Sequence, residues 1–194
     1  MKRSFRTLEG LFGSIIRADK KHMNYTFTFI NDLPADFSGV PILISGEGSL
    51  KWEGKTYLKP SGTIYDAALF EINHQYDGLP FKQAMLIGHL LAVGYQQHFY
   101  LFDLSANKHL LTLQMDGYFG HLYFDQDVFY VTDSEQAYCI TKEAVILWES
   151  EPVGLDGVII DHFMDHEIHG SGEWDPPGGW KDFVLDRQTG KLKK

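Results

Sequence analysis

The sequence predicts an all-β protein made of repeated antiparallel hairpins that form a meander, in a barrel-like or propeller-like arrangement. Residues 98–103, 128–133 and 181–186 are runs of aromatic and aliphatic side chains, and each run ends at an aspartate. Aromatic and β-branched side chains favour pleated strands, whereas aspartate favours a chain reversal. A polar turn and a second run follow each aspartate, so a strand–turn–strand unit recurs.

The aspartates of the three copies are Asp103, Asp133 and Asp186, which lie 30 and 53 residues apart. Spacings of this size are typical of stacked or radially arranged hairpins. We interpret each aspartate as a turn former at the end of a structural repeat. The longer second interval contains an insertion, and any functional site is expected there.

The N-terminal third also favours strands. Residues 4–16 place apolar side chains at near-helical spacing and predict at most one short helix. Strict alternation at 25–29 and an apolar run at 40–45 predict two strands. Residues 51–57 are typical of a tight hairpin, and residues 63–72 of a longer strand.

Strands continue through the rest of the chain. They are predicted at 85–95, at the second runs of the repeats (110–115 and 144–148), and at 157–160 and 168–174 inside the insertion. We expect one all-β domain over residues 1–194. A sub-boundary near 76–82 would divide it into an N-terminal β meander (1–75) and a hairpin-repeat part (83–194).

Composition narrows the class of protein. A hydrophobic fraction of 44% supports a globular core, and no apolar run approaches the roughly 20 residues needed to cross a bilayer. The first residues are basic but lack the apolar core of a secretion signal. Cys139 is the single cysteine, so an internal disulfide is impossible. We therefore expect a cytoplasmic protein that does not bind a membrane.

Charge is distributed unevenly along the chain. The first 21 residues carry six basic and two acidic residues, whereas the rest carries 11 basic and 24 acidic ones. Residues 149–186 contain ten carboxylates and one base, Lys181. A negative field repels phosphate backbones and attracts basic partners. The sequence therefore disfavours nucleic acid and favours a basic protein partner.

The last repeat has a family resemblance. Residues 183–192, Phe-Val-Leu-Asp-Arg-Gln-Thr-Gly-Lys-Leu, resemble the blade repeat of quinoprotein-type β-propellers, in which a strand enters an Asp-x-x-Thr-Gly-Lys turn. Residues 99–108 match this pattern less closely, and 128–137 poorly. The resemblance implies hairpin architecture. A full propeller needs about 4–8 four-stranded blades, and a chain of this length has room for four blades at most. No residues match quinone-cofactor ligands, and we expect no cofactor.

The insertion contains a dense group of polar side chains. Residues 161–169 include three histidines and three carboxylates: Asp161, His162, Asp165, His166, Glu167 and His169. Zinc needs three or four converging ligands, which these residue types can supply. The flanking predicted strands make residues 164–167 a hairpin loop, and a solvated hairpin tip is the favoured interpretation. A metal site, or a pH-sensitive or protein-binding role, remains the alternative.

A rigid loop follows, with two prolines and two glycines between Glu173, Trp174, Asp175 and Trp180. The favoured interpretation is that the tryptophans cap an open end of the sheet. A surface that binds protein or sugar is the second. The third is glycoside hydrolysis, for which two carboxylates must stand about 5–9.5 Å apart across the sugar.

No nucleotide-binding loop, nucleophile elbow or zinc-protease motif occurs. Two hypotheses follow. The first is a non-catalytic acidic binding protein that docks a basic protein partner, as a bacterial immunity or inhibitor protein does. The second is a carbohydrate-binding or carbohydrate-acting enzyme, with or without a metal, that uses residues 161–180. No catalytic or metal-ligating residue is assigned, and the candidate binding residues are Asp161, His162, Asp165, His166, Glu167, His169, Glu173, Trp174, Asp175 and Trp180.

Overall fold

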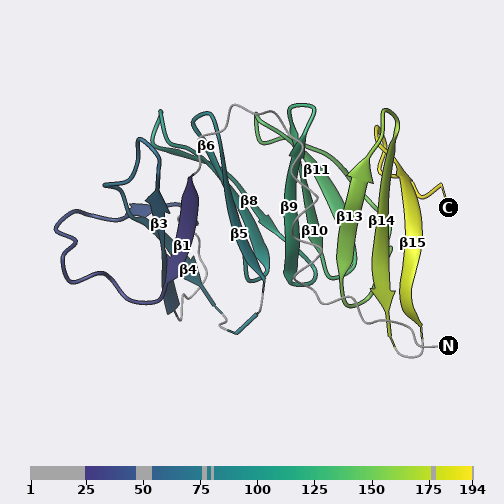
Figure 1. Cartoon of the computed structure of the whole chain (residues 1–194), viewed down its shortest axis with the longest axis horizontal. Helices are drawn as coiled ribbons and strands as arrows, with labels where there is room; N and C mark the ends of the chain where they lie inside the picture. The colour runs from purple at the N-terminus through teal and green to yellow at the C-terminus, as the bar shows by residue number, and fades with distance from the viewer. Residues whose placement is uncertain (1–24, 47–53, 76–77, 80, 176–177, 194) are drawn as a thin grey trace.

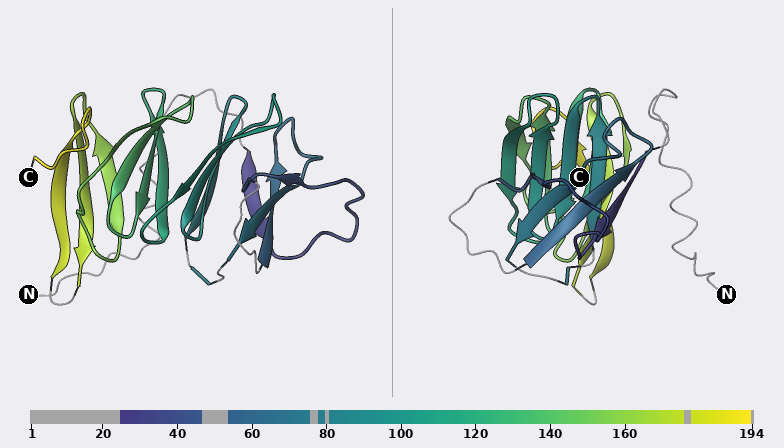
Figure 2. Two further views of the ribbon diagram at one scale, coloured as in Figure 1. Left: turned by 180° about the vertical axis from the view of Figure 1, so that it is seen from behind. Right: turned by 90° about the vertical axis from the view of Figure 1, so that its left-hand side faces the viewer.

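Four small β-sheets follow one another in a row in the computed structural model, which describes residues 25–46, 54–75, 78–79, 81–175 and 178–193 (Figure 1). We number the sheets as blades 1 to 4 in chain order. The same row is seen from behind and from its end in Figure 2. The described residues contain no helix, and hence none that is long and apolar enough to span a membrane.

Blade 1 has the strand order β1-β3-β4-β2. Its strands are β1 (Thr26–Ile30), β2 (Ile42–Leu43), β3 (Gly54–Ser61) and β4 (Phe70–His74). Strand β2 runs parallel to β4, while the other pairs are antiparallel. Blade 1 therefore departs from a simple meander.

Blades 2 and 3 are regular antiparallel meanders, in which each strand pairs with the next one along the chain. Blade 2 contains β5 (Lys82–Ile87), β6 (Leu90–Tyr95), β7 (His98–Asp103) and β8 (Lys108–Gln114). Blade 3 contains β9 (Phe119–Asp125), β10 (Val128–Asp133), β11 (Ala137–Thr141) and β12 (Ile146–Glu149).

Blade 4 contains β13 (Val158–Phe163), β14 (Glu167–Trp174) and β15 (Gly179–Asp186). An isolated antiparallel bridge between Leu185 and Leu192 brings the segment after the aspartate turn back beside β15. The strand, aspartate turn and returning segment predicted from residues 183–192 are thus present, and the resemblance to propeller blades is confirmed.

The all-β fold of repeated hairpins is confirmed in its propeller-like form, because the sheets remain four separate blades rather than one closed barrel. The helix predicted at 4–16 lies outside the described residues. The sub-boundary proposed near 76–82 falls between β4 and β5.

One local prediction in blade 1 is wrong. Residues 63–69 do not belong to a strand, because Asp66 accepts hydrogen bonds from the backbone amides of Gly62 (3.0 Å) and Thr63 (2.6 Å) and holds a turn there. Such local side-chain bonds compete with the sheet ladder. Of the hairpin predicted at 51–57, residues 54–57 begin the long strand β3, and residues 51–53 lie outside the described residues.

The hydrophobic core consists of three layers, one between each pair of neighbouring blades. In β7, Tyr100 and Phe102 face blade 1, whereas Phe99 and Leu101 face blade 3. Successive side chains of a strand point to opposite faces, so a strand with a blade on each side is apolar throughout. This explains the continuous apolar runs of β7 and β10, whereas β15 lies in the end blade and has a blade on one side only.

The three repeated aspartates are confirmed as turn formers. One carboxylate oxygen of each accepts backbone amides two and three residues ahead, at 2.8 and 3.0 Å for Asp103, 2.8 and 2.6 Å for Asp133, and 3.1 and 3.0 Å for Asp186. Each interaction fixes the backbone reversal that leads to the next strand.

Candidate functional site

The face of blade 4 that is turned away from blade 3 collects acidic side chains. Glu167 pairs across the sheet with Asp186, Glu173 with Trp180, and Ser171 with Asp182. Directly paired residues lie on the same face of a sheet. The opposite face carries Ile168, Phe183 and Leu185, which pack against blade 3.

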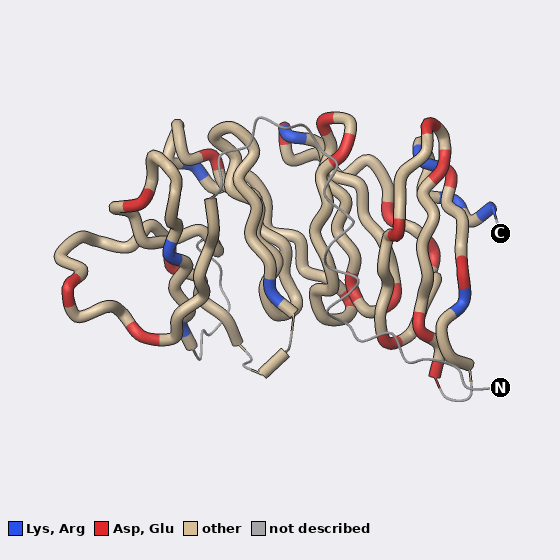
Figure 3. The backbone as a smooth tube through the Cα atoms, viewed as in Figure 1, with Lys and Arg blue, Asp and Glu red and all other residues tan. Residues whose placement is uncertain are grey.

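We call this outer surface the acidic face and define it by five residues: Asp161, Glu167, Glu173, Asp182 and Asp186. Figure 3 marks positions of aspartate and glutamate along all three strands of blade 4. No other sheet of the described part of the chain packs against it. The acidic face therefore lies at the end of the row of described blades, where Asp161 and Asp182 are exposed and the other three carboxylates partly exposed.

A β-bulge in β13 sets the position of Asp161. The register shifts between Ile160 and His162, so that His162 lies opposite His169. A bulge inserts an unpaired residue and re-aims its side chain. Partial burial of its carboxyl group, and then the negative charge of Asp182, raise the pKa of Asp161 above its ordinary value, while His162 acts in the opposite direction.

Two of the three predicted histidines meet on the acidic face. The rings of His162 and His169 stack with centroids 4.6 Å apart, and Nε2 of His169 lies 3.0 Å from Oε2 of Glu167. His166 lies instead in the exposed turn after β13, together with Asp165. The described residues include no group of three or more His, Cys, Asp or Glu arranged to hold a metal ion.

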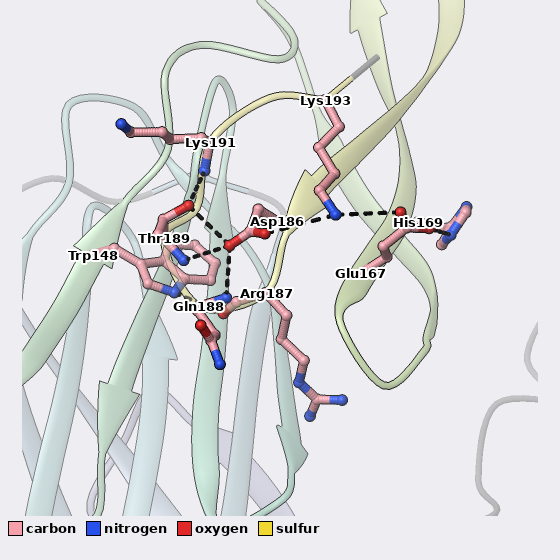
Figure 4. A network of polar contacts seen from close by, with 9 residues as sticks. All are labelled: Trp148, Glu167, His169, Asp186, Arg187, Gln188, Thr189, Lys191 and Lys193. Atoms are coloured by element: carbon pink, nitrogen blue, oxygen red, sulfur yellow. Dashed lines mark hydrogen bonds and ion pairs between the residues drawn. The ribbon is translucent and has the colours of Figure 1, made fainter.

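Lys193 forms the basic contact of the acidic face (Figure 4). Its Nζ atom lies 3.3 Å from Oε1 of Glu167 and 3.6 Å from Oδ2 of Asp186. The hydrogen bond from His169 and then that from Lys193 lower the pKa of Glu167. Such exposed pairs contribute little to stability, and one lysine leaves the five carboxylates with a negative excess.

The tryptophans of the adjacent loop do not converge. Trp180 lies on the acidic face opposite Glu173, whereas Trp174 is on the other face, where Nζ of Lys181 lies 5.2 Å from its ring. Asp175 is exposed in the loop itself. The structure thus brings Trp180 and Glu173 together but places Trp174 on the opposite side of the hairpin.

Two hollows of about 410 and 490 Å³ lie far from these residues. The first is lined by residues 36–40, Ile42 and 67–69 of blade 1. The second lies between blade 1 and the edge of blade 2 at Phe102 and His109. Neither hollow contains a candidate binding residue from the sequence.

Sequence reasoning missed a buried cation beside the site. The guanidinium of Arg187 reaches from the turn of blade 4 into blade 3, where Nε donates to the Tyr130 hydroxyl at 3.0 Å and Nη2 pairs with Asp125. The sequence shows that Arg187 follows the turn aspartate Asp186, but it does not show that Arg187 pairs with Asp125, 62 positions away.

Comparisons with known proteins add structural neighbours. No protein-family model matches the sequence, and no curated protein does. The similar solved structures include BamB from Moraxella catarrhalis, with 12% identity and a TM-score of 0.45 over 87% of this chain and 51% of that one. They also include the AfRom2 CNH domain, with 10% identity and a TM-score of 0.35 over 53% of this chain and 32% of that one. The chain thus spans about half or less of these two neighbours.

Proposed function

We propose that this protein is a non-catalytic binding protein whose acidic face docks a basic region of a protein partner. The observation that carries the proposal is the gathering of Glu167, Glu173, Asp182 and Asp186 on one sheet face, with Asp161 at the bulge of β13 close enough to interact with Asp182, against a single contacting lysine. An inhibitor or immunity protein that neutralises a basic toxin or nuclease is one class with this chemistry. The expected compartment is the cytoplasm.

Electrostatics favour this role over catalysis. A surface of one sign steers oppositely charged partners and speeds their association. The acidic face also offers Trp180, which is 49% exposed beside Glu173. Tryptophan is enriched among residues that dominate binding energy at protein interfaces. An exposed aromatic side chain among carboxylates therefore suits a basic protein surface.

The carbohydrate hypothesis has less support. An aromatic platform for a sugar needs rings on one side of a cleft, but Trp174 and Trp180 lie on opposite faces of the β14–β15 hairpin. The two hollows described above lie at blade 1 and its boundary with blade 2, so neither offers a cleft at the candidate carbohydrate-binding residues 161–180.

Charge reversal tests the proposal. The variant carries Asp161→Lys, Glu173→Lys and Asp182→Lys, which leaves the turn-forming Asp186 and the Glu167 contacts intact. Binding to polylysine and to a panel of basic proteins is measured by calorimetry.

A control variant reverses Asp32, Asp36 and Asp116, which are exposed outside blade 4, and changes the net charge equally. We expect the blade 4 variant to lose binding and the control to keep it. Equal weakening in both variants would show that only net charge matters, and the proposal would fail.

A further inference from the structure

The outermost strand of blade 3 presents an exposed apolar segment. Val145, Ile146 and Leu147 are consecutive, and their exposed fractions are 53%, 41% and 55%. Val145 immediately precedes β12, and the register between β11 and β12 shifts between Cys139 and Ile140, which leaves Leu147 unpaired in a β-bulge. A bulge interrupts the regular alternation of side chains, and all three aliphatic side chains reach solvent here. Strand β12 ends the order of its sheet, and within the described ranges no strand pairs with its outer edge.

The blade repeat does not require this segment. The corresponding outermost strand of blade 2 is β8, which exposes Lys108, Thr112 and Gln114 and keeps its leucines half-buried. The two strands have the same place in neighbouring four-stranded meanders. Of blades 2 and 3, only blade 3 therefore exposes aliphatic residues at its outermost strand.

Acidic side chains flank the apolar segment on both sides. Glu143 precedes it, and Glu149 and Glu151 follow it, all three exposed. The neighbouring base, Lys142, is bound to Asp127, with Nζ and Oδ1 2.9 Å apart. The edge of β12 thus has an apolar centre with negative ends.

We propose that β12 is a docking strand to which a partner protein adds an extended segment with an apolar centre and basic ends. An unpaired edge offers backbone donors and acceptors for such strand addition. The exposed aliphatic residues would be covered by the apolar centre, and the glutamates would meet the basic ends. This inference concerns blade 3 and does not depend on the acidic face of blade 4.

A second copy of the chain fits this edge poorly. If two β12 strands paired antiparallel around Leu147, Glu143 of one copy would face Glu151 of the other copy. Like charges that face each other across strands are destabilising. Charge complementarity therefore selects a basic partner segment over self-association.

The test uses a synthetic peptide with lysines at both ends and alternating valine and threonine between them. A matched peptide has glutamates at its ends. Amide hydrogen exchange of the full chain is followed by NMR with each peptide. We expect the lysine-ended peptide to slow exchange in β12 at least tenfold, and the glutamate-ended peptide to have no effect.

Leu147→Lys and Val145→Lys are each expected to weaken peptide binding at least tenfold without lowering the Tm. Ile64→Lys, at an 83% exposed site in blade 1, is the matched control and should bind normally. Protection at β14 and β15 instead of β12, equal binding of both peptides, or no binding of the lysine-ended peptide would each overturn the inference. A dimer of the unmodified protein that Leu147→Lys dissociates would also overturn it. Because the readout is residue-specific, failure here is distinct from failure of the acidic face.

Discussion

Arg187 links blade 4 to blade 3 through one buried cation, and replacing it measures how strongly the two blades depend on each other. The residue is 8% exposed. Its guanidinium donates to the Tyr130 hydroxyl (3.0 Å), to the Met164 carbonyl oxygen (3.0 Å) and to the Asp125 carboxylate. The rings of Tyr130 and Phe163 lie 5.6 and 5.3 Å from its central carbon.

The expected magnitude follows from these contacts. Arg187→Ala removes all three hydrogen bonds and leaves Asp125 without its cation. Breaking a buried ion pair costs about 3–5 kcal/mol. Because the side chain of Asp125 is 36% exposed, water can solvate the freed carboxylate, and we expect the low end. A loss of about 3 kcal/mol in the free energy of unfolding corresponds to a Tm lower by about 6–12 °C for a domain of this size.

Equilibrium denaturation of three variants provides the assay. Arg187→Lys keeps the charge but not the planar fork of donors, so its stability should fall between that of Arg187→Ala and that of the unmodified protein. Lys59→Ala, at an exposed position in blade 1, should change the stability by less than about 0.5 kcal/mol. A loss below about 1 kcal/mol for Arg187→Ala would refute the reasoning, since that is the typical cost of an ordinary substitution.

Three further predictions concern single side chains. Asp133→Ala should lower the free energy of unfolding by about 3 kcal/mol, and Asp103→Ala by about 1 kcal/mol. The difference is expected because Asp133 is fully buried and also accepts a hydrogen bond from the Tyr138 hydroxyl at 3.0 Å. Equal losses of stability in denaturation curves of the two variants would contradict this. Burial and a neighbouring carboxylate hold the pKa of Asp161 above its ordinary value, so the folded protein loses stability as the pH rises from the ordinary to the raised value. Asp161→Asn should therefore be more stable than the unmodified protein at pH 7, and a lower Tm would argue against the account. Burial raises the pKa of the Cys139 thiol to about 11, so it should resist thiol reagents at pH 8 until denaturant is added; rapid labelling of the native protein would disprove this.

The local features of the fold could be predicted from the sequence because short-range chemistry decides them. An aspartate after an apolar run forms a turn with amides two and three residues ahead, and all three repeats do so. The strand predicted at 63–72 is wrong over residues 63–69 for the same reason, because Asp66 forms a turn there and the strand begins only at Phe70. Turn chemistry there outweighed the apolar character of the segment.

Features that depend on which strands become neighbours could not be predicted. The opposite orientations of Trp174 and Trp180 follow from the register of β14 and β15. The exposure of Ile146 follows from the place of β12 at the edge of its sheet. The partner of Arg187 is set by the contact between two blades. Of the candidate carboxylates, Asp165 and Asp175 lie in turns away from the acidic face, whereas Asp182 and Asp186, which lie on that face, were not among the candidate binding residues. The register of the strands, which places Asp182 and Asp186 opposite Ser171 and Glu167, required the structure.

The central proposal is that the acidic face of blade 4 binds a basic partner. The most direct measurement is an NMR titration of the unmodified protein with the basic protein that binds most tightly in the calorimetric panel, with backbone shifts followed for every assigned residue. The account predicts that the largest shifts fall on β13, β14 and β15, at Asp161, Glu167, Glu173 and Asp182. Shifts spread evenly over the surface, or concentrated on blade 1, would contradict it.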